Sequence, residues 1–201
     1  MNIGTLMKII VLIVVSALLA SILNGFEYIL LVAAAAMIHE SGHIIAAKAL
    51  GVPSCGGGSS IFGLSLKYDF SSVSYLREVA VSAAGALFNI IACAVTLLTA
   101  RAPGTYAIFF VFSNLSLALF NLIPISPLDG AGILGALISI VAPPRISERI
   151  SAWVSAAFSF LFFVFCIYVQ LKVGANLSLM FISVFLLYNG MNGVKRIKEE
   201  P

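Results

Sequence analysis

Long apolar runs dominate the chain, and polar residues gather mainly in short segments between them. Five of these runs have about the 20-residue length of a membrane-spanning helix, and they cover residues 5–23, 28–50, 79–100, 150–171 and 175–194. A longer run, residues 106–141, is interrupted by the segment Asn-Leu-Ile-Pro-Ile-Ser-Pro-Leu-Asp-Gly. Because proline cannot continue a regular helix, this run cannot form one straight helix. The pattern predicts an all-α integral membrane protein with about six transmembrane helices.

Composition supports the same class. The 201 residues are 61% hydrophobic and 9% charged, whereas a soluble domain carries about 25% charged residues. The net charge of +3 is too small to indicate a nucleic-acid partner. No polar insert is large enough for a second folded domain, so we expect one membrane-embedded domain over residues 1–201. The first run could be a signal peptide, but no small-x-small cleavage site follows it, which favours a retained anchor.

One loop departs from the helical pattern. Between residues 62 and 70, aromatic and aliphatic side chains alternate with small or polar ones, the period of a half-buried strand. We expect a small β-hairpin or re-entrant loop here. It could present a substrate by strand addition, because a helical substrate has its backbone groups bonded internally and must unwind before cleavage. The alternative is an amphipathic surface hairpin with no role in binding.

The basic residues orient the spans. With a cytoplasmic N-terminus, nine of the 11 lysine and arginine residues fall on the cytoplasmic side, and only Arg101 and Lys172 fall outside. This asymmetry follows the positive-inside rule. It predicts a multi-pass protein of the cell membrane with both termini in the cytoplasm, and it places His39 and Asp129 at similar depths.

Chemistry is concentrated in the second run, where the segment His39-Glu40-Ser41-Gly42-His43 interrupts alanine and isoleucine. Residues i and i+4 share one face of a helix, so His39 and His43 can bind one metal ion, with Glu40 beside them as the general base. Zinc lowers the pKa of a bound water to about 7. The alternative is a pair of histidines that hydrogen-bond between helices. Ionisable residues inside a membrane are costly and usually functional.

A catalytic zinc site usually has three protein ligands, and the chain contains only two histidines. Of its eight acidic residues, only Glu40 and Asp129 lie well inside apolar runs. Asp129 is therefore the candidate third ligand. Pro124, Pro127 and Gly130 around it predict irregular backbone, which at membrane depth lines a protein-covered or wet cavity. The alternative is a proline kink in which Asp129 caps a helix.

Together, the His39–His43 segment and the segment around Asp129 resemble the site-2 protease family of intramembrane zinc metalloproteases. A third element of that family, Gly-x-x-x-Asn, is matched by Gly85 and Asn89. The resemblance covers residues 28–141, the expected three-helix catalytic core. It implies one Zn²⁺ per chain, held by the two histidines and the aspartate, and cleavage of a membrane-embedded or membrane-tethered protein.

The resemblance also assigns secondary roles. Matching asparagines in the family are thought to position substrate or stabilise the oxyanion, so Asn89 and Asn121 are candidates, although either could instead join helices. Three positions depart from the family pattern, namely Ala86, Leu122 and the Gly130-Ala131-Gly132 spacing. The short chain is most similar to the sporulation-type branch, which cleaves a precursor of a transcription factor.

The partners implied are the substrate, the lipid bilayer and a regulatory membrane protein. The alternative functions are a non-proteolytic membrane scaffold that retains the metal site and a zinc-handling transporter. A transporter would be expected to carry more polar residues along a path through the other spans. The runs at 5–23, 150–171 and 175–194 have no ionisable residue at their centres, which favours the protease.

Overall fold

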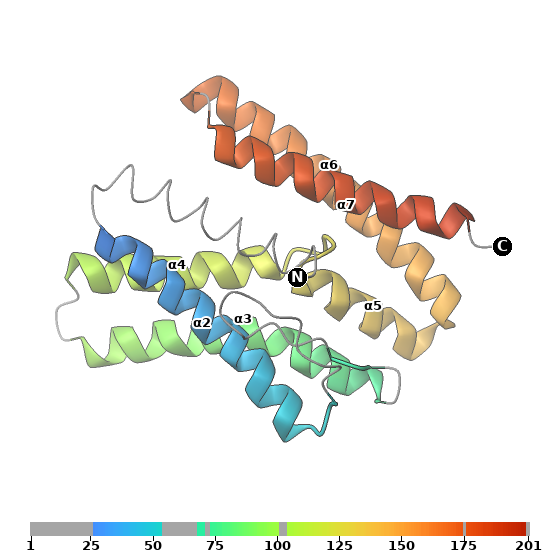
Figure 1. The fold of residues 1–201 in the computed structure, drawn as a ribbon, viewed down its shortest axis with the longest axis horizontal. Helices are drawn as coiled ribbons and strands as arrows, with labels where there is room; N and C mark the ends of the chain where they lie inside the picture. Colours follow the sequence, from blue (N-terminus) through green and yellow to red (C-terminus); the bar gives the residue numbers. More distant parts are fainter. Residues whose placement is uncertain (1–25, 54–67, 71–72, 101–103, 175, 200–201) are drawn as a thin grey trace. The chain divides into compact units, whose positions relative to one another are not determined.

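The computed structural model of the protein describes the chain over residues 26–53, 68–70, 73–100, 104–174 and 176–199. The chain divides into two compact units at the Asn121–Leu122 boundary. The first unit contains α2 (Phe26–Ala49), α3 (Tyr75–Thr99) and α4 (Thr105–Asn121). The second contains α5 (Asp129–Val141), α6 (Pro144–Val173) and α7 (Leu177–Glu199), as Figure 1 shows.

The three described helices of the first unit pack against one another. α2 and α4 meet through aromatic rings, because the ring centroid of Tyr28 lies 5.5 Å from that of Tyr106 and 4.7 Å from that of Phe109. α3 and α4 share a hydrogen bond in which the Cys93 thiol donates to the Val111 carbonyl at 3.3 Å. Side chains from all three helices therefore hold this unit together.

Small residues bring α2 and α3 close together. The buried residues of α2 recur every three or four positions and so form one helical face; they are Val32, Ala35, His39, Gly42, His43 and Ala47. A Cβ atom added at Gly42 would lie 2.6 Å from the backbone oxygen of Ala84 in α3. Small residues allow this kind of close backbone approach between membrane helices. As a result, backbone carbonyls of α3 lie within reach of α2 side chains.

In the second unit, α6 packs against both α5 and α7. Small polar residues line the contact of α6 with α7, and a Cβ atom added at Gly190 would lie 3.0 Å from the Ser155 carbonyl oxygen. The buried hydroxyls of Ser159 and Ser183 each donate to a carbonyl three residues earlier, at 2.9 Å. The seam is thus tightly packed without leaving these two hydroxyls unsatisfied.

The predicted interruption of the long apolar run, residues 106–141, is confirmed. α4 ends at Asn121 and α5 begins at Asp129, and residues 122–128 between them are not helical. The Ser126 backbone amide donates to the Ser155 hydroxyl of α6 at 2.9 Å, and the Leu128 amide donates to the Ile125 carbonyl at 2.7 Å. Ile125 is fully buried. The break is therefore an ordered turn anchored to α6.

Among the described residues, four helices are long and apolar enough to cross a membrane, and they are α2, α3, α6 and the segment Leu177–Lys195 of α7. Large apolar side chains such as Leu98, Phe165 and Phe181 are exposed on them, as expected of surfaces that contact lipid rather than water. α4 and α5 are shorter apolar helices. These features indicate a membrane protein, while the predicted first span, residues 5–23, lies outside the described residues.

The predicted β-hairpin stays a prediction, because residues 62–67 also lie outside the described residues. In the described part of that segment, Tyr68 forms a single bridge rather than a strand. The Asp69 backbone amide donates to the Pro53 carbonyl at 2.9 Å. This bond joins the two described ends of the loop close to where α2 ends.

Candidate metal centre

α2 carries the two histidines and the glutamate of the predicted motif. His39 and His43 lie one helical turn apart on the buried face of α2, and their side chains are 4% and 6% exposed. Their ring centroids are 4.9 Å apart, and the ring planes are nearly perpendicular, at 80°. Glu40 follows His39 on the same helix and is half-buried. The helix therefore presents two imidazoles together, with a carboxylate beside them.

A backbone carbonyl of α3 fixes the ring of His43. Nδ1 of His43 lies 2.7 Å from the Val81 carbonyl oxygen. A carbonyl oxygen can only accept a hydrogen bond, so Nδ1 must carry the hydrogen and donate it. In the neutral ring, the hydrogen is then absent from Nε2, which keeps the lone pair that a metal ion requires. The contact therefore selects the metal-binding tautomer of His43 as well as its orientation.

Asn89 of α3 does the same for His39. Its side-chain Oδ1 lies 2.6 Å from Nδ1 of His39. Its Nδ2 donates to the Ala35 carbonyl at 3.0 Å, which identifies the nitrogen end of the amide. The oxygen end must then face His39, so Nδ1 of His39 donates and Nε2 holds the lone pair. Such outer hydrogen bonds are the usual way in which proteins orient histidine ligands.

Gly85 provides the space in which the two rings lie. Val81, Gly85 and Asn89 are spaced four residues apart on α3, so they share one face of the helix. A Cβ atom added at Gly85 would lie 2.7 Å from both Cε1 and Nε2 of His39, and it would also overlap Nε2 of His43. Only glycine leaves room at this position. The space that it opens lies beside both candidate ligand atoms.

Asp129 is the first residue of α5 and is half-buried. The partial positive charge at a helix N-terminus favours an ionised carboxylate there. The next residue, Gly130, is buried, and a Cβ atom added to it would lie 2.5 Å from the Ile123 carbonyl oxygen and also overlap that of Leu122. The close return of the chain onto this turn therefore requires glycine, and the turn places the carboxylate at the start of α5.

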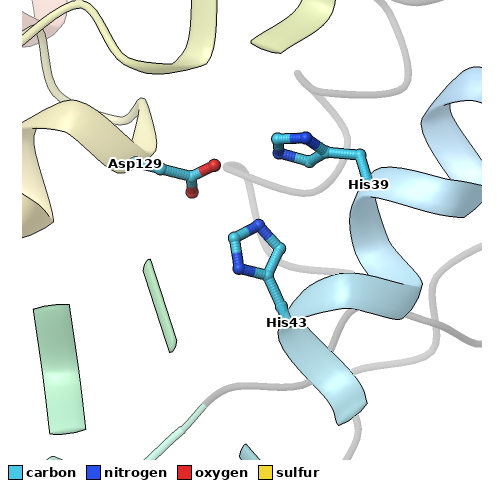
Figure 2. A group of neighbouring side chains, drawn as sticks. All are labelled: His39, His43 and Asp129. Carbon is cyan, nitrogen blue, oxygen red and sulfur yellow. The ribbon is translucent and has the colours of Figure 1, made fainter. Parts of the chain in front are cut away.

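His39, His43 and Asp129 form a group that could hold a metal ion. One potential ligand atom from each lies within 4.8 Å of the other two. Figure 2 shows these three side chains, two imidazole rings carried by α2 and one carboxylate at the start of α5. Two imidazole nitrogens and one carboxylate oxygen form a typical ligand set for a catalytic zinc ion. The tautomers of both histidines and the space at Gly85 fit such an ion.

The two candidate asparagines have different surroundings. Asn89 is fully buried and bonded to His39. Asn121 ends α4, is also buried, and its Nδ2 donates to the carbonyl of Leu117 in its own helix at 2.9 Å. Asn89 thus contacts a candidate ligand directly, whereas the contact of the Asn121 amide nitrogen is local.

Two groups near the histidines, the Val81 carbonyl and the Tyr68 side chain, were not predicted individually from the sequence. Burial, and to a smaller extent the nearby Glu40 carboxylate, raise the pKa of Tyr68 to about 12. The phenol is consequently neutral at physiological pH and remains a hydrogen-bond donor near Glu40. A contact made by a backbone carbonyl cannot be predicted from side-chain patterns. Tyr68 was recognised only as one residue of the alternating segment.

Comparison with known families supports the predicted resemblance. Residues 97–165 match the family model described as peptidase family M50. The matched segment includes Asn121, the proline-containing turn and Asp129, but not the two histidines. No curated protein matches the chain. The match confirms the similarity to the site-2 protease family and, together with the apolar helices, indicates a membrane metalloprotease.

Proposed function

We propose that this chain, which is similar to peptidase family M50 over residues 97–165, is a zinc endopeptidase that cleaves proteins within or beside the membrane. The observation that carries the proposal is the group of potential ligand atoms from His39, His43 and Asp129, which lie within 4.8 Å of one another. The expected depth of the site in the membrane supports this substrate class. His39 lies ten residues before the end of α2, which is about 15 Å at the rise of 1.5 Å per residue. A bond cut there must belong to a membrane-embedded or membrane-tethered chain.

Each ligand has a defined part in holding the ion. His39 and His43 would bind one Zn²⁺ through Nε2, since Nδ1 of each ring is engaged by Asn89 and Val81. Asp129 would supply one carboxylate oxygen, favoured as an anion by its place at the start of α5. Zinc, when bound, supplies Lewis acidity that polarises the scissile carbonyl and acidifies the attacking water.

Glu40 is the general base. Its carboxylate is adjacent to the ligands and is not needed to hold the ion. It takes a proton from the attacking water while the water oxygen bonds to the scissile carbonyl carbon. As the carbon–nitrogen bond breaks, the same carboxyl group returns the proton to the leaving amine. Its half-buried position limits competing water around the carboxylate, which strengthens its interaction with the reacting groups.

Removal of the metal tests the proposal. The probe is a single-span reporter protein whose apolar helix contains Gly and Pro near its cytoplasmic end, because these residues weaken a helix and expose its backbone. The purified enzyme in detergent should cut this reporter, lose that activity after treatment with a zinc chelator, and regain it when Zn²⁺ is returned. A matched reporter with Ala and Leu in place of Gly and Pro should be cut more slowly. Undiminished cleavage by enzyme shown by metal analysis to be zinc-free would contradict the proposal.

The orientation of the protein is a second testable part. We expect a reporter fused after residue 201 to be cytoplasmic and one inserted within residues 101–105 to be exterior. The reason is that nine of the 11 basic residues then fall on the cytoplasmic side. Compartment-specific enzyme reporters measure this directly. The reverse labelling would invert the topology and place the candidate site toward the outer face.

A further inference from the structure

We propose that Asn114 on α4 is a positioning residue for His39 and acts on it through Asn89. Asn114, Asn89 and His39 form a continuous chain of hydrogen bonds across α4, α3 and α2. These hydrogen bonds keep the hydrogen of the neutral His39 ring on Nδ1, so that Nε2 carries none. The significance of that state for catalysis rests on the proposed function, but the hydrogen-bond chain itself does not.

The chain of hydrogen bonds begins at the backbone carbonyl of Phe110, which can only accept a hydrogen bond. Nδ2 of Asn114 donates to the backbone carbonyl of Phe110 at 2.9 Å. This contact identifies the nitrogen end of the Asn114 amide. Its oxygen end, Oδ1, therefore faces α3, where it accepts a hydrogen bond from Nδ2 of Asn89 at 2.7 Å. The orientation of the Asn114 amide is thus set within α4, and its Oδ1 in turn orients the amide of Asn89 on α3.

Two acceptors fix the orientation of the Asn89 amide in the same sense. Its Nδ2 has two hydrogens, and these go to the Ala35 carbonyl at 3.0 Å and to Oδ1 of Asn114 at 2.7 Å. If the Asn89 amide were reversed, its oxygen would face two other oxygens, and its NH₂ group would face Nδ1 of His39. That arrangement would place the hydrogen of a neutral His39 on Nε2, where a metal ion must bind.

Burial makes this selection strong. Asn89 and Asn114 are both 0% exposed, so bulk water does not reach either amide to replace a lost partner. Nδ2 of Asn89 is also fully engaged, whereas an oxyanion donor would need a hydrogen of that group to be available. A role in orienting His39 therefore suits Asn89 better than direct stabilisation of an oxyanion.

The tautomers of the two histidines can be measured in the metal-free protein. Histidine-selective ¹⁵N labelling gives signals from His39 and His43 alone, because the chain has no other histidine. Two-bond ¹⁵N–¹H correlation spectra in detergent, recorded above the usual imidazole pKa of about 6.5, distinguish the two tautomers. We expect both wild-type rings to carry hydrogen on Nδ1.

Asn114→Leu should leave Asn89 free to reverse, so His39 should show a mixture of tautomers while His43 remains unchanged. His43 is an internal control because it bonds to the Val81 backbone. Asn189→Leu is the matched control, since Asn189 makes the same contact with a carbonyl four residues earlier, that of Phe185, at 2.8 Å. Zinc affinity, measured by competition with a chelating dye, should fall about 10–100-fold in Asn114→Leu, as for other outer-shell partners, and should stay at the wild-type value in Asn189→Leu.

A second variant covers the case in which Asn114→Leu disturbs the packing and affects both rings. Asn114→Asp, protonated in this buried position, can donate to Phe110 and accept from Asn89, so it should keep the wild-type tautomer of His39. A mixed His39 tautomer in Asn114→Asp would overturn the proposal, as would an unmixed tautomer and unchanged zinc affinity in Asn114→Leu. Failure of the wild type to bind zinc would instead count against the proposed function, because the tautomer spectra do not depend on metal.

Discussion

Glu40→Gln is expected to abolish detectable cleavage while the purified protein keeps its full zinc content. Glutamine has nearly the same size as glutamate but cannot accept the proton of the attacking water. General acid–base catalysis contributes about 10²–10⁴-fold in rate, so the loss should be easy to measure with the single-span reporter. Glu27→Gln is the matched control, because Glu27 is an exposed acid in the first turn of the same helix. It should cleave at the wild-type rate.

The ligands should behave differently from the base. His43→Ala or Asp129→Ala removes one of three protein ligands, and the two that remain are too few for a typical catalytic zinc site. Both zinc and activity should therefore be lost together. Metal analysis and cleavage assays on the same preparations separate the roles. The assignment is wrong if Glu40→Gln purifies without zinc, or if Asp129→Ala keeps full zinc and cleaves normally. Zinc binding by a wild-type protein that does not cut the reporter would favour the scaffold interpretation.

Hydrophobic patterning predicted the positions of the described helices, because lipid imposes a minimum length on apolar segments. The predicted ends were less accurate where polar residues belong to a helix. The fifth span was predicted from residue 150, but α6 begins at Pro144. Proline is favoured in the first helical turn because its fixed φ suits that position, and Arg145, Glu148 and Arg149 lie outside the apolar run that marked the span. α7 likewise continues past residue 194 to Glu199.

The candidate site was predictable as far as its chemistry is carried by side chains in recognisable patterns. Helical periodicity placed His39 and His43 on one face, and elimination left Asp129. The atoms that orient the rings were not predictable in this way. Val81 acts through its backbone carbonyl, which no side-chain pattern reveals. Asn114 lies outside the motifs, and its link to His39 depends on how α3 and α4 pack. The proposed substrate-presenting hairpin remains a prediction.

Gly85 has a steric role that its place in a motif does not reveal. The sequence marks this glycine only as part of Gly-x-x-x-Asn, whereas the structure gives its physical reason. A methyl group here would lie 2.7 Å from two ring atoms of His39 and would also overlap Nε2 of His43. Neither ring can move away without cost, because each Nδ1 is held by a short hydrogen bond, at 2.6 Å for His39 and 2.7 Å for His43. The added carbon would therefore compete with both candidate ligand atoms at once.

Gly85→Ala should accordingly weaken zinc binding by about 100-fold or more, at least the upper end of the effect of losing an outer-shell partner, with a matching loss of cleavage. Gly135→Ala is the matched control, because a Cβ atom there would meet its nearest neighbour, Ser151 Oγ, at an ordinary 3.5 Å. Alanine stabilises a helix interior relative to glycine by about 0.5–1 kcal/mol, so Gly135→Ala should keep its zinc and unfold at the same or a higher temperature. Chelator competition and thermal unfolding in detergent measure both effects. If Gly85→Ala binds zinc as tightly as Gly135→Ala does, the space beside the two rings is not what this glycine provides.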